Sequence, residues 1–326
     1  MARTILVTGA TGKVGRRFID RLHETHPDDH VRALCHTRAL PESPWLSVVR
    51  GSIAERTVAD AAMRGATHVV HLATCKETPE DVMDVTVKGL FWLLEAARVS
   101  PSLRRFMLIG GDAAMGHFVY PHPLPVTETQ RWSPYPGCYA LSKVLEEAML
   151  EQYYIQYGLD GCCLRAPWIM EKDDFRYTLR FGDDQFGGPP WRDLIGAEAA
   201  ASHAATGAVP ILQDGAGVAI KRNFVHVDDL VDAMLIALDH PRAKQQLFNI
   251  CMDEPVDYAE VATHLARTRG LASVPIRSRF HSTWLDNRKA RLLLGWKPLY
   301  DLPRLVDAAW DYRRAADDPR KIWYPG

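Results

Sequence analysis

The chain has 326 residues, of which 47% are hydrophobic, so it can bury a sizeable core in one large or two coupled domains. Its formal net charge of −1 gives no electrostatic reason to expect a nucleic acid or an anionic membrane as a partner. No apolar run approaches the roughly 18 residues that span a bilayer, and no signal-peptide pattern precedes the first strand, so we expect a cytoplasmic protein with small-molecule partners.

The chain begins with a short apolar run followed by a glycine turn. Residues 5–7, Ile-Leu-Val, are typical of a parallel strand that is covered on both faces. A glycine then stands at every third position: Gly9, Gly12 and Gly15. This spacing lets a bare backbone turn tightly, approach a pyrophosphate and begin a helix, Val14–Leu22, whose free N–H groups hold the phosphates. We therefore predict a dinucleotide site, although glycines alone also fit an ordinary loop.

The second predicted strand, Val31–Cys35, bears on the choice of cofactor. In NAD-binding folds a carboxylate at the end of this strand holds the ribose 2′-hydroxyl. Here the strand is followed by His36, Thr37 and Arg38. Because no acid would repel a 2′-phosphate and Arg38 can pair with one, the sequence slightly favours NADP over NAD. The alternative for Arg38 is a solvated loop cation.

Strands and helices continue to alternate through the first half of the chain. We predict strands at residues 48–49, His68–Ala73 and Arg105–Ile109, with helices at Val58–Met63 and Val82–Val99. This alternation is typical of a parallel, right-handed sheet. Ala73 and Thr74 would lie at the carboxyl edge of that sheet, where ligands bind in doubly wound folds.

A strong helical pattern at Tyr139–Tyr157 places a phenol and an ammonium on one face, because Tyr139 and Lys143 are four residues apart. At roughly 5 Å and an effective dielectric near 20, the ammonium favours the phenolate by about 3 kcal/mol. We therefore expect the pKa of Tyr139 to fall from about 10 towards the working pH, where a phenol can exchange a proton with a substrate hydroxyl. The alternative is an ordinary pair on the surface of a helix.

With these two motifs, the chain resembles the extended short-chain dehydrogenase/reductase family, of the NAD-dependent epimerase/dehydratase type. The resemblance extends over nearly the whole length. Further landmarks occur in the family's order: His71-Leu-Ala73, Leu90–Arg98, Leu164-Arg165, Arg222–Asp229, Phe248–Ile250 and Asp286–Trp296. It implies an α/β fold in which a Rossmann-type doubly wound parallel sheet, residues 1–166 plus 222–254, is joined by a smaller C-terminal α+β substrate domain, residues 167–221 plus 255–326.

The resemblance also implies roles for individual residues. Tyr139 is the acid/base, and Lys143 holds the nicotinamide ribose while lowering the pKa of the tyrosine. The residues expected to contact NAD or NADP are Gly9, Thr11, Gly12, Lys13, Val14, Gly15, His36, Arg38, Ser52, Ile53, Leu72, Ala73, Thr74, Tyr139 and Lys143. Arg222 occupies the position that grips the substrate diphosphate in nucleotide-sugar enzymes. Its alternative is a salt bridge with Asp228 or Asp229.

Four departures from the family pattern concern the reaction, the substrate and the cofactor. The family's catalytic Ser or Thr after the fifth strand is Gly111 here, so Asp112, a water or a backbone group substitutes, or the activity is reduced or altered. The alternative for Asp112 is a turn residue. Nucleotide-sugar dehydratases carry an acid at the position of Asp112 and then a glutamate, which is Ala113 here, so dehydration ranks low. Trp168 replaces an Asn that contacts the diphosphate, which puts a nucleotide sugar in doubt; an indole suits stacking on a sugar ring, with burial in the core as its alternative. Ser52 stands where an Asp often contacts adenine.

Together these features predict an NAD(P)-dependent oxidoreductase or epimerase that transfers a hydride at a hydroxyl carbon of a sugar, sugar acid or nucleotide sugar. Gly111, Trp168 and Arg222 would then face the substrate. The alternative is a catalytically impaired protein that senses NAD(P), which the missing Ser or Thr permits and the retained Tyr139 and Lys143 oppose.

Four further expectations concern the rest of the chain. We expect residues 171–188 to cover the substrate and residues 296–326 to form a packed tail. A homodimer is expected from the family, with helices Leu90–Arg98 and Tyr139–Tyr157 pairing across a two-fold axis; the alternative is that their apolar faces pack internally. The six cysteines lack Cys-x-x-Cys spacing or a His-Cys cluster, so we expect buried free thiols and no metal site.

Overall fold

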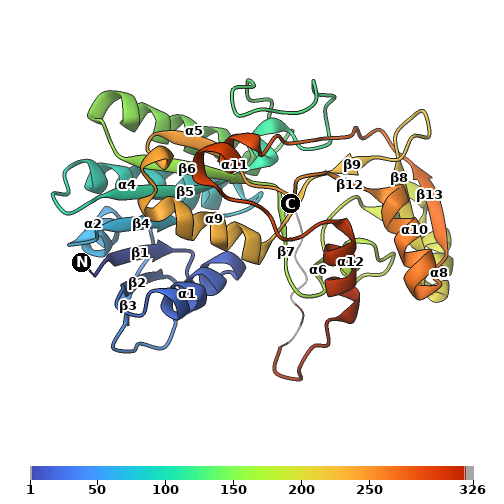
Figure 1. Ribbon diagram of the computed structural model, residues 1–326, viewed down its shortest axis with the longest axis horizontal. Helices are drawn as coiled ribbons and strands as arrows, with labels where there is room; N and C mark the ends of the chain where they lie inside the picture. The colour runs from blue at the N-terminus through green and yellow to red at the C-terminus, as the bar shows by residue number, and fades with distance from the viewer. Residues whose placement is uncertain (1, 319, 321–326) are drawn as a thin grey trace.

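A seven-stranded sheet organises the larger part of the molecule (Figure 1). The computed structural model describes residues 2–318 and 320. The strand order is β11-β6-β5-β4-β1-β2-β3, and every neighbouring pair is parallel. The strands are β1 (Thr4–Thr8), β2 (His30–Cys35), β3 (Leu46–Arg50), β4 (His68–His71), β5 (Arg105–Gly111), β6 (Gly161–Ala166) and β11 (Gln246–Asn249). This order confirms the predicted Rossmann-type doubly wound fold.

Helices cover both faces of the sheet, and each face has its own hydrophobic core. On one face lie α1 (Lys13–Thr25), α9 (Val227–Asp239) and α11 (Arg288–Leu294); on the other lie α2 (Arg56–Met63), α4 (Gly89–Arg98) and α5 (Cys138–Tyr157). The strand β1 serves both cores, since Ile5 and Val7 point into the first and Leu6 into the second. Burial on both faces explains why the strand is apolar without alternation.

The predicted helix Val82–Val99 has an irregular start. It begins at α3 (Pro79–Asp81), continues as a π-helical segment, η1 (Val82–Lys88), and becomes regular only in α4. The remaining short helices of the lobe are the 3₁₀ turns η2 (Asp112–Met115) and η3 (Pro241–Ala243).

The second lobe is smaller and lies beside the carboxyl edge of the sheet (Figure 1). Its strands pair two by two: β7 (Trp168–Met170) with β10 (Phe224–His226), β8 (Val209–Gln213) with β13 (Ser273–Arg277), and β9 (Lys221–Arg222) with β12 (Val256–Asp257). Its helices are α6 (Asp174–Thr178), α7 (Trp191–Ile195), α8 (Ala197–Thr206), α10 (Tyr258–Arg269) and α12 (Leu302–Asp311). They enclose a third core around Trp191 and Tyr258.

The packing of residues 288–296 corrects the predicted domain division. We assigned residues 255–326 to the substrate domain, but α11 and Trp296 pack into the core beneath the sheet. The indole of Trp296 donates a hydrogen bond to the backbone oxygen of Asp229, 2.9 Å away. The chain therefore returns to the first lobe before α12 packs against the second. The end of the predicted tail, residues 319 and 321–326, lies outside the described residues.

Two further observations concern the whole of the described chain. All six cysteines are free; Cys75 and Cys138 are half-buried and the other four are buried. Over residues 2–318 and 320, no helix combines the length and apolar character that a bilayer crossing requires.

Candidate active site

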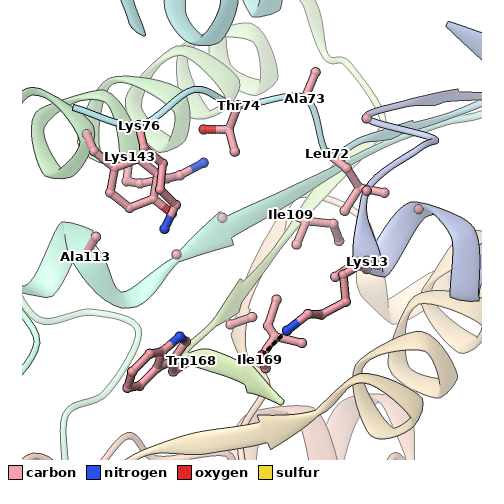
Figure 2. A pocket seen from close by; sticks show the side chains of 18 of the residues that line it. Lys13, Leu72, Ala73, Thr74, Lys76, Ile109, Ala113, Lys143, Trp168 and Ile169 are labelled. Atoms are coloured by element: carbon pink, nitrogen blue, oxygen red, sulfur yellow. Dashed lines mark hydrogen bonds between the residues drawn. The ribbon is translucent and has the colours of Figure 1, made fainter. Parts of the chain in front are cut away.

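A cavity of about 860 Å³ opens where the strands of the sheet reach their carboxyl ends. It lies between the two lobes, because residues that follow β1, β2, β4 and β5 line one side and residues of the second lobe line the other. Figure 2 shows Lys76 and Lys143 on one side and Trp168 and Ile169 across from them. Every residue predicted to contact cofactor or substrate lines this cavity, from Gly9 in the glycine turn to Arg222.

The glycine turn at one end of the cavity leaves no room for a side chain at Gly9 or Gly15. Gly9 has φ +65°, and a Cβ there would lie 2.8 Å from the backbone carbon of Leu72. A Cβ on Gly15 would lie 2.4 Å from the backbone oxygen of Gly9, so α1 can approach the turn only without one. No side chain caps the first turn of α1, whose N–H groups therefore remain available for a ligand. The cradle fits the pyrophosphate of a dinucleotide.

Lys13, inside this turn, connects the two lobes. Its ammonium donates a hydrogen bond to the backbone oxygen of Ile169 at 3.0 Å (Figure 2). It also forms an ion pair with Asp174 on α6. The predicted covering segment, residues 171–188, lines the cavity through several of its residues, and so do Arg314 and Asp318 near the end of the chain. Arg314 pairs in turn with Asp173. These contacts hold the second lobe over the glycine turn.

The other end of the cofactor region carries no acid after β2. Cys35 is buried at the end of that strand, and His36 and Arg38 are exposed at the rim. Ser52 and Ile53, after β3, complete this part of the lining. The arrangement leaves Arg38 available for a ligand, because no ion pair of this side chain occurs among the described residues.

Tyr139 and Lys143 lie in the first turns of α5 and face the centre of the cavity. The Lys143 ammonium lies 5.3 Å from the centre of the Tyr139 ring and donates a hydrogen bond to Glu146 at 2.7 Å. The expectation of a lowered phenol pKa is wrong for the net effect. Desolvation raises the pKa of Tyr139, Lys143 lowers it, and Glu146 with two other carboxylates raises it further. The helical spacing predicted the Lys143 contribution but not the burial that outweighs it.

Gly111 lies where the missing hydroxyl side chain would act. A Cβ on Gly111 would lie 3.7 Å from the Tyr139 hydroxyl and 3.6 Å from Cδ of Lys143, which is ordinary contact distance. Its φ of −140° suits any residue, so the backbone does not require glycine. The preceding Gly110 differs, since a Cβ there would meet the sulfur of Cys163 at 2.9 Å. The absence of Ser or Thr therefore reflects neither space nor backbone conformation.

Lys76 is a residue of the site that the sequence analysis missed. Its ammonium lies 4.5 Å from the centre of the Tyr139 ring. Desolvation and the nearby Lys143 lower the pKa of Lys76 to about 7. It follows Ala73 by three residues, so its place after the fourth strand could have identified it. Its neighbour Glu77 accepts a hydrogen bond from the backbone N–H of Tyr139 at 3.4 Å and thereby caps the start of α5.

Arg222 lines the cavity from the second lobe and lies between aromatic rings. Its guanidinium carbon lies 4.3 Å from the centre of the Phe118 ring and 4.4 Å from that of Trp168. The alternative of a salt bridge is wrong, because Asp228 pairs with Arg17 and Asp229 accepts backbone N–H groups near residue 300. Trp168 is half-buried: its ring stacks in the second core, and it also lines the cavity.

The described residues contain no candidate metal site. Among residues 2–318 and 320, no three His, Cys, Asp or Glu side chains are placed to hold a metal ion together.

Comparisons with known proteins agree with this geometry. The family model described as NAD dependent epimerase/dehydratase matches residues 5–170 and 185–251. A bifunctional dihydroflavonol 4-reductase/flavanone 4-reductase from Malus domestica is 23% identical, covering 96% of this chain and 91% of its own. A UDP-glucose 4-epimerase from Mycolicibacterium smegmatis is 29% identical, covering 90% and 93%.

Solved structures share the fold at similar identity. A short-chain dehydrogenase/reductase superfamily protein from Agrobacterium tumefaciens with bound NAD has a TM-score of 0.78 at 23% identity, covering 94% of this chain and 95% of its own. A UDP-glucuronic acid 4-epimerase from Bacillus cereus in complex with NAD has a TM-score of 0.71 at 20% identity, covering 95% and 96%. The family match spans the glycine cradle, Tyr139 and Lys143. The chain therefore belongs to the NAD-dependent epimerase/dehydratase family of extended short-chain dehydrogenases/reductases.

Proposed function

We propose that the protein is an NAD(P)-dependent oxidoreductase or epimerase that acts at a hydroxyl-bearing carbon of a sugar, sugar acid or nucleotide sugar. The observation that carries the proposal is the convergence of the glycine cradle, Tyr139 and Lys143 on one cavity of about 860 Å³. A bound nicotinamide supplies the hydride acceptor or donor. The chain's own residues bind, orient and exchange the proton.

Tyr139 handles the proton that accompanies the hydride. When a substrate hydroxyl is oxidised, its proton passes to the Tyr139 oxygen, and reduction reverses the transfer. Lys143 lowers the pKa of Tyr139 against the effect of desolvation. Its hydrogen bond with Glu146 fixes the ammonium beside the phenol.

Arg222 and Trp168 support a substrate that combines a ring with a negatively charged group. Nη1 of Arg222 is buried and has no hydrogen-bond partner among the described residues. A carboxylate or phosphate would satisfy it, and the indole of Trp168 offers a face for a sugar ring. Relatives named for UDP-glucose and UDP-glucuronate support the same class.

Replacing Tyr139 by Phe tests the catalytic part of the proposal. The purified protein is incubated with NAD or NADP and a panel of sugar acids, sugar alcohols and nucleotide sugars, with absorbance and product stereochemistry followed. We expect Tyr139→Phe to lower kcat at least about 100-fold while cofactor affinity stays within twofold, because only proton transfer is lost. Tyr157→Phe, at the far end of the same helix, is the control. Unchanged turnover in Tyr139→Phe would reject the assigned role.

The same panel separates the possible outcomes. Net cofactor reduction indicates a dehydrogenase, whereas inversion of a hydroxyl without net reduction indicates an epimerase. The absence of a hydroxyl at Gly111 supports a second candidate function, in which the protein senses NAD(P) without turnover. Cofactor binding with no reaction on any compound, together with a partner protein retained only in the presence of cofactor, would favour that candidate.

Arg38 supports a preference for NADP over NAD. Its guanidinium lies exposed at the rim after β2, where a 2′-phosphate would carry two negative charges towards it. We expect Arg38→Ala to weaken NADPH binding about tenfold and to change NADH affinity less than twofold, as measured by cofactor fluorescence. Arg64→Ala, outside the cavity, serves as the control. Equal affinities for both cofactors in the unaltered protein would overturn the preference.

A further inference from the structure

A carboxylate and an imidazole lie together beside the position of the missing side chain. Asp112 directly follows Gly111, is buried, and has its Oδ1 2.8 Å from Nδ1 of His117. A sharp reversal of the chain makes this contact possible, because Gly116 (φ 78°) and His117 (φ 49°) are both left-handed and turn the chain back after η2. Asp112 and His117 line the same cavity as Tyr139.

Further contacts hold the imidazole in place. Its ring stacks on Tyr135, with centroids 5.1 Å apart and planes 24° apart, and the Tyr135 hydroxyl points to Glu77 at 3.5 Å. Asp112 follows Gly111, where a Cβ would lie 3.7 Å from the Tyr139 hydroxyl. Asp112 and His117 therefore lie in the part of the cavity lined by Gly111 and Tyr139.

We propose that His117, oriented by Asp112, donates the hydrogen bond to the substrate's reacting oxygen that a Ser or Thr at position 111 makes elsewhere in the family. The inference rests on the proposed function. When the imidazole is protonated, both ring nitrogens carry a hydrogen, so that Nδ1 faces the Asp112 carboxylate while Nε2 donates to the substrate.

The reaction remains balanced with His117 in this role. On oxidation, the hydroxyl proton passes to Tyr139 and the hydride leaves the same carbon for the nicotinamide. His117 gives up no proton in this step, and its hydrogen bond stabilises the charge that develops on the oxygen. Asp112 is then a positioning residue, since it acts on the substrate only through the imidazole.

The space at Gly111 provides a decisive test by rescue. A Cβ there meets nothing closer than 3.6 Å, so Gly111→Ser should fold and present a hydroxyl to the same oxygen. We expect His117→Ala to lower kcat/KM about 100-fold on the substrate identified by the panel. Adding Gly111→Ser to His117→Ala should restore at least tenfold. The matched control is His281→Gln, whose side chain does not line the cavity among the described residues; it should leave kcat/KM unchanged.

Rescue by a conservative variant gives a readout that a structural role would not move. The groups that face His117 are Asp112, Tyr135 and Glu77, together with His122, whose ring contacts the backbone of residue 117. In His117→Gln the side-chain amide still donates a hydrogen bond, so this variant should keep about tenfold more kcat/KM than His117→Ala.

A third measurement does not need a substrate. Imidazole ¹⁵N NMR, assigned by comparison with His117→Gln, should show a shift of the His117 ring nitrogens when Asp112→Asn replaces the facing carboxylate. Unchanged His117 nitrogen shifts in Asp112→Asn, wild-type kcat/KM in His117→Ala, or failure of Gly111→Ser to restore activity would each overturn the inference. Loss of activity in Tyr139→Phe with full activity in His117→Ala rejects only this inference. Full activity in Tyr139→Phe rejects the proposed function itself.

Discussion

At the scale of single residues, the glycines of the cavity lack a side chain for different reasons. Gly9 and Gly15 are required because backbone atoms lie within 3 Å of where a Cβ would be. Gly111 is not required by space or by backbone conformation. The missing side chain at Gly111 therefore affects the chemistry of the cavity. Lys76 and His117 line the cavity, and residue 111 contributes no hydroxyl to it.

Lys76 lowers the free energy of unfolding at neutral pH. Its pKa falls to about 7 on folding from an ordinary value of 10.5, so between these values the unfolded chain binds more protons than the folded one. The stability of the protein should therefore rise with pH across this window, and the full penalty applies below pH 7. A cation retained at this cost beside Tyr139 points to a role in the site.

Replacing Lys76 by Met tests this argument. We expect the free energy of unfolding to increase by about 1 to 3 kcal/mol at pH 6, since each pKa unit is worth about 1.4 kcal/mol and partial exposure screens some of it. The gain should shrink towards zero by pH 10. Denaturant titrations at pH 6, 8 and 10 measure it, with Lys88→Met on the exposed part of η1 as the control. A gain that is independent of pH would contradict the explanation.

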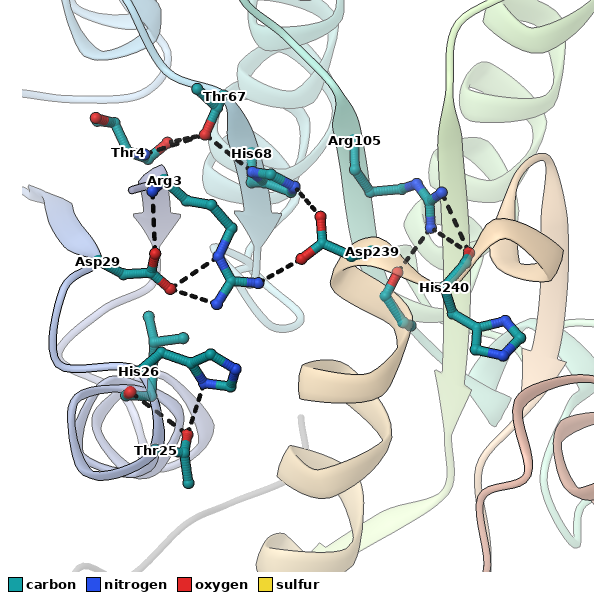
Figure 3. A network of polar contacts seen from close by, with 12 residues as sticks. Arg3, Thr4, Thr25, His26, Asp29, Thr67, His68, Arg105, Asp239 and His240 are labelled. Atoms are coloured by element: carbon teal, nitrogen blue, oxygen red, sulfur yellow. Dashed lines mark hydrogen bonds and ion pairs between the residues drawn. The ribbon is translucent and has the colours of Figure 1, made fainter. Parts of the chain in front are cut away.

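At the scale of elements, the two edges of the sheet have separate tasks. The carboxyl ends of the strands form the cavity, whereas a polar network joins the amino ends to the end of α9 (Figure 3). Arg3 pairs with Asp29 and Asp239, and His68 contacts Asp239 at 3.1 Å. Because β1, β4 and β5 are parallel, residues that begin these strands meet at one edge. This network stabilises the sheet from the side opposite the site.

Arg105 begins β5 and is a buried member of this edge (Figure 3). It donates hydrogen bonds to Asp160 at 2.5 Å and to the backbone oxygens of Ala237 at 2.7 Å and His240 at 3.3 Å. We expect Arg105→Met to lower the free energy of unfolding by about 3 kcal/mol, because buried acceptors lose their donor. Cofactor affinity should not change. Calorimetry and cofactor fluorescence measure the two effects.

The matched control is Arg98→Met, which removes a surface pair with Glu95. It should cost less than about 1 kcal/mol. A large change in cofactor affinity in Arg105→Met would show that the two edges of the sheet are not independent.

At the scale of the whole molecule, both lobes are needed for one site. The first supplies the glycine cradle, Tyr139 and Lys143, and the second supplies Trp168 and Arg222. The solvent-exposed face of α4 and α5 is partly apolar, because the side chains of Phe91 and Ile155 are 38% and 69% exposed. We expect this face to pair with a second copy across a two-fold axis, as the family resemblance implies.

A charge placed in that face tests the expected homodimer. We expect the unaltered protein to be a dimer at micromolar concentration and Phe91→Glu to be a monomer, measured by light scattering after size-exclusion chromatography. Leu292→Glu is the control, because Leu292 is 76% exposed on α11 at the opposite face of the sheet. A monomeric unaltered protein, or a dimer that persists in Phe91→Glu, would reject this interface.

The sequence alone determined the features that depend on neighbours along the chain. The glycine turn, the alternation of strands with helices and the spacing of Tyr139 and Lys143 are local patterns, and each predicted its element and its place at the cavity. The family resemblance placed Gly111 at the position of the catalytic Ser or Thr, and in the structure a Cβ there would lie 3.7 Å from the Tyr139 hydroxyl.

Only the tertiary structure decided the properties that depend on burial and on residues distant in sequence. The net pKa shift of Tyr139 could not be predicted, since desolvation arises from packing and outweighs the local effect of Lys143. The aromatic rings around Arg222 and the return of Trp296 to the first core bring together residues from separate segments. Spacing along one helix or strand is specified within a few residues, whereas contacts between elements are set by how all of them pack together.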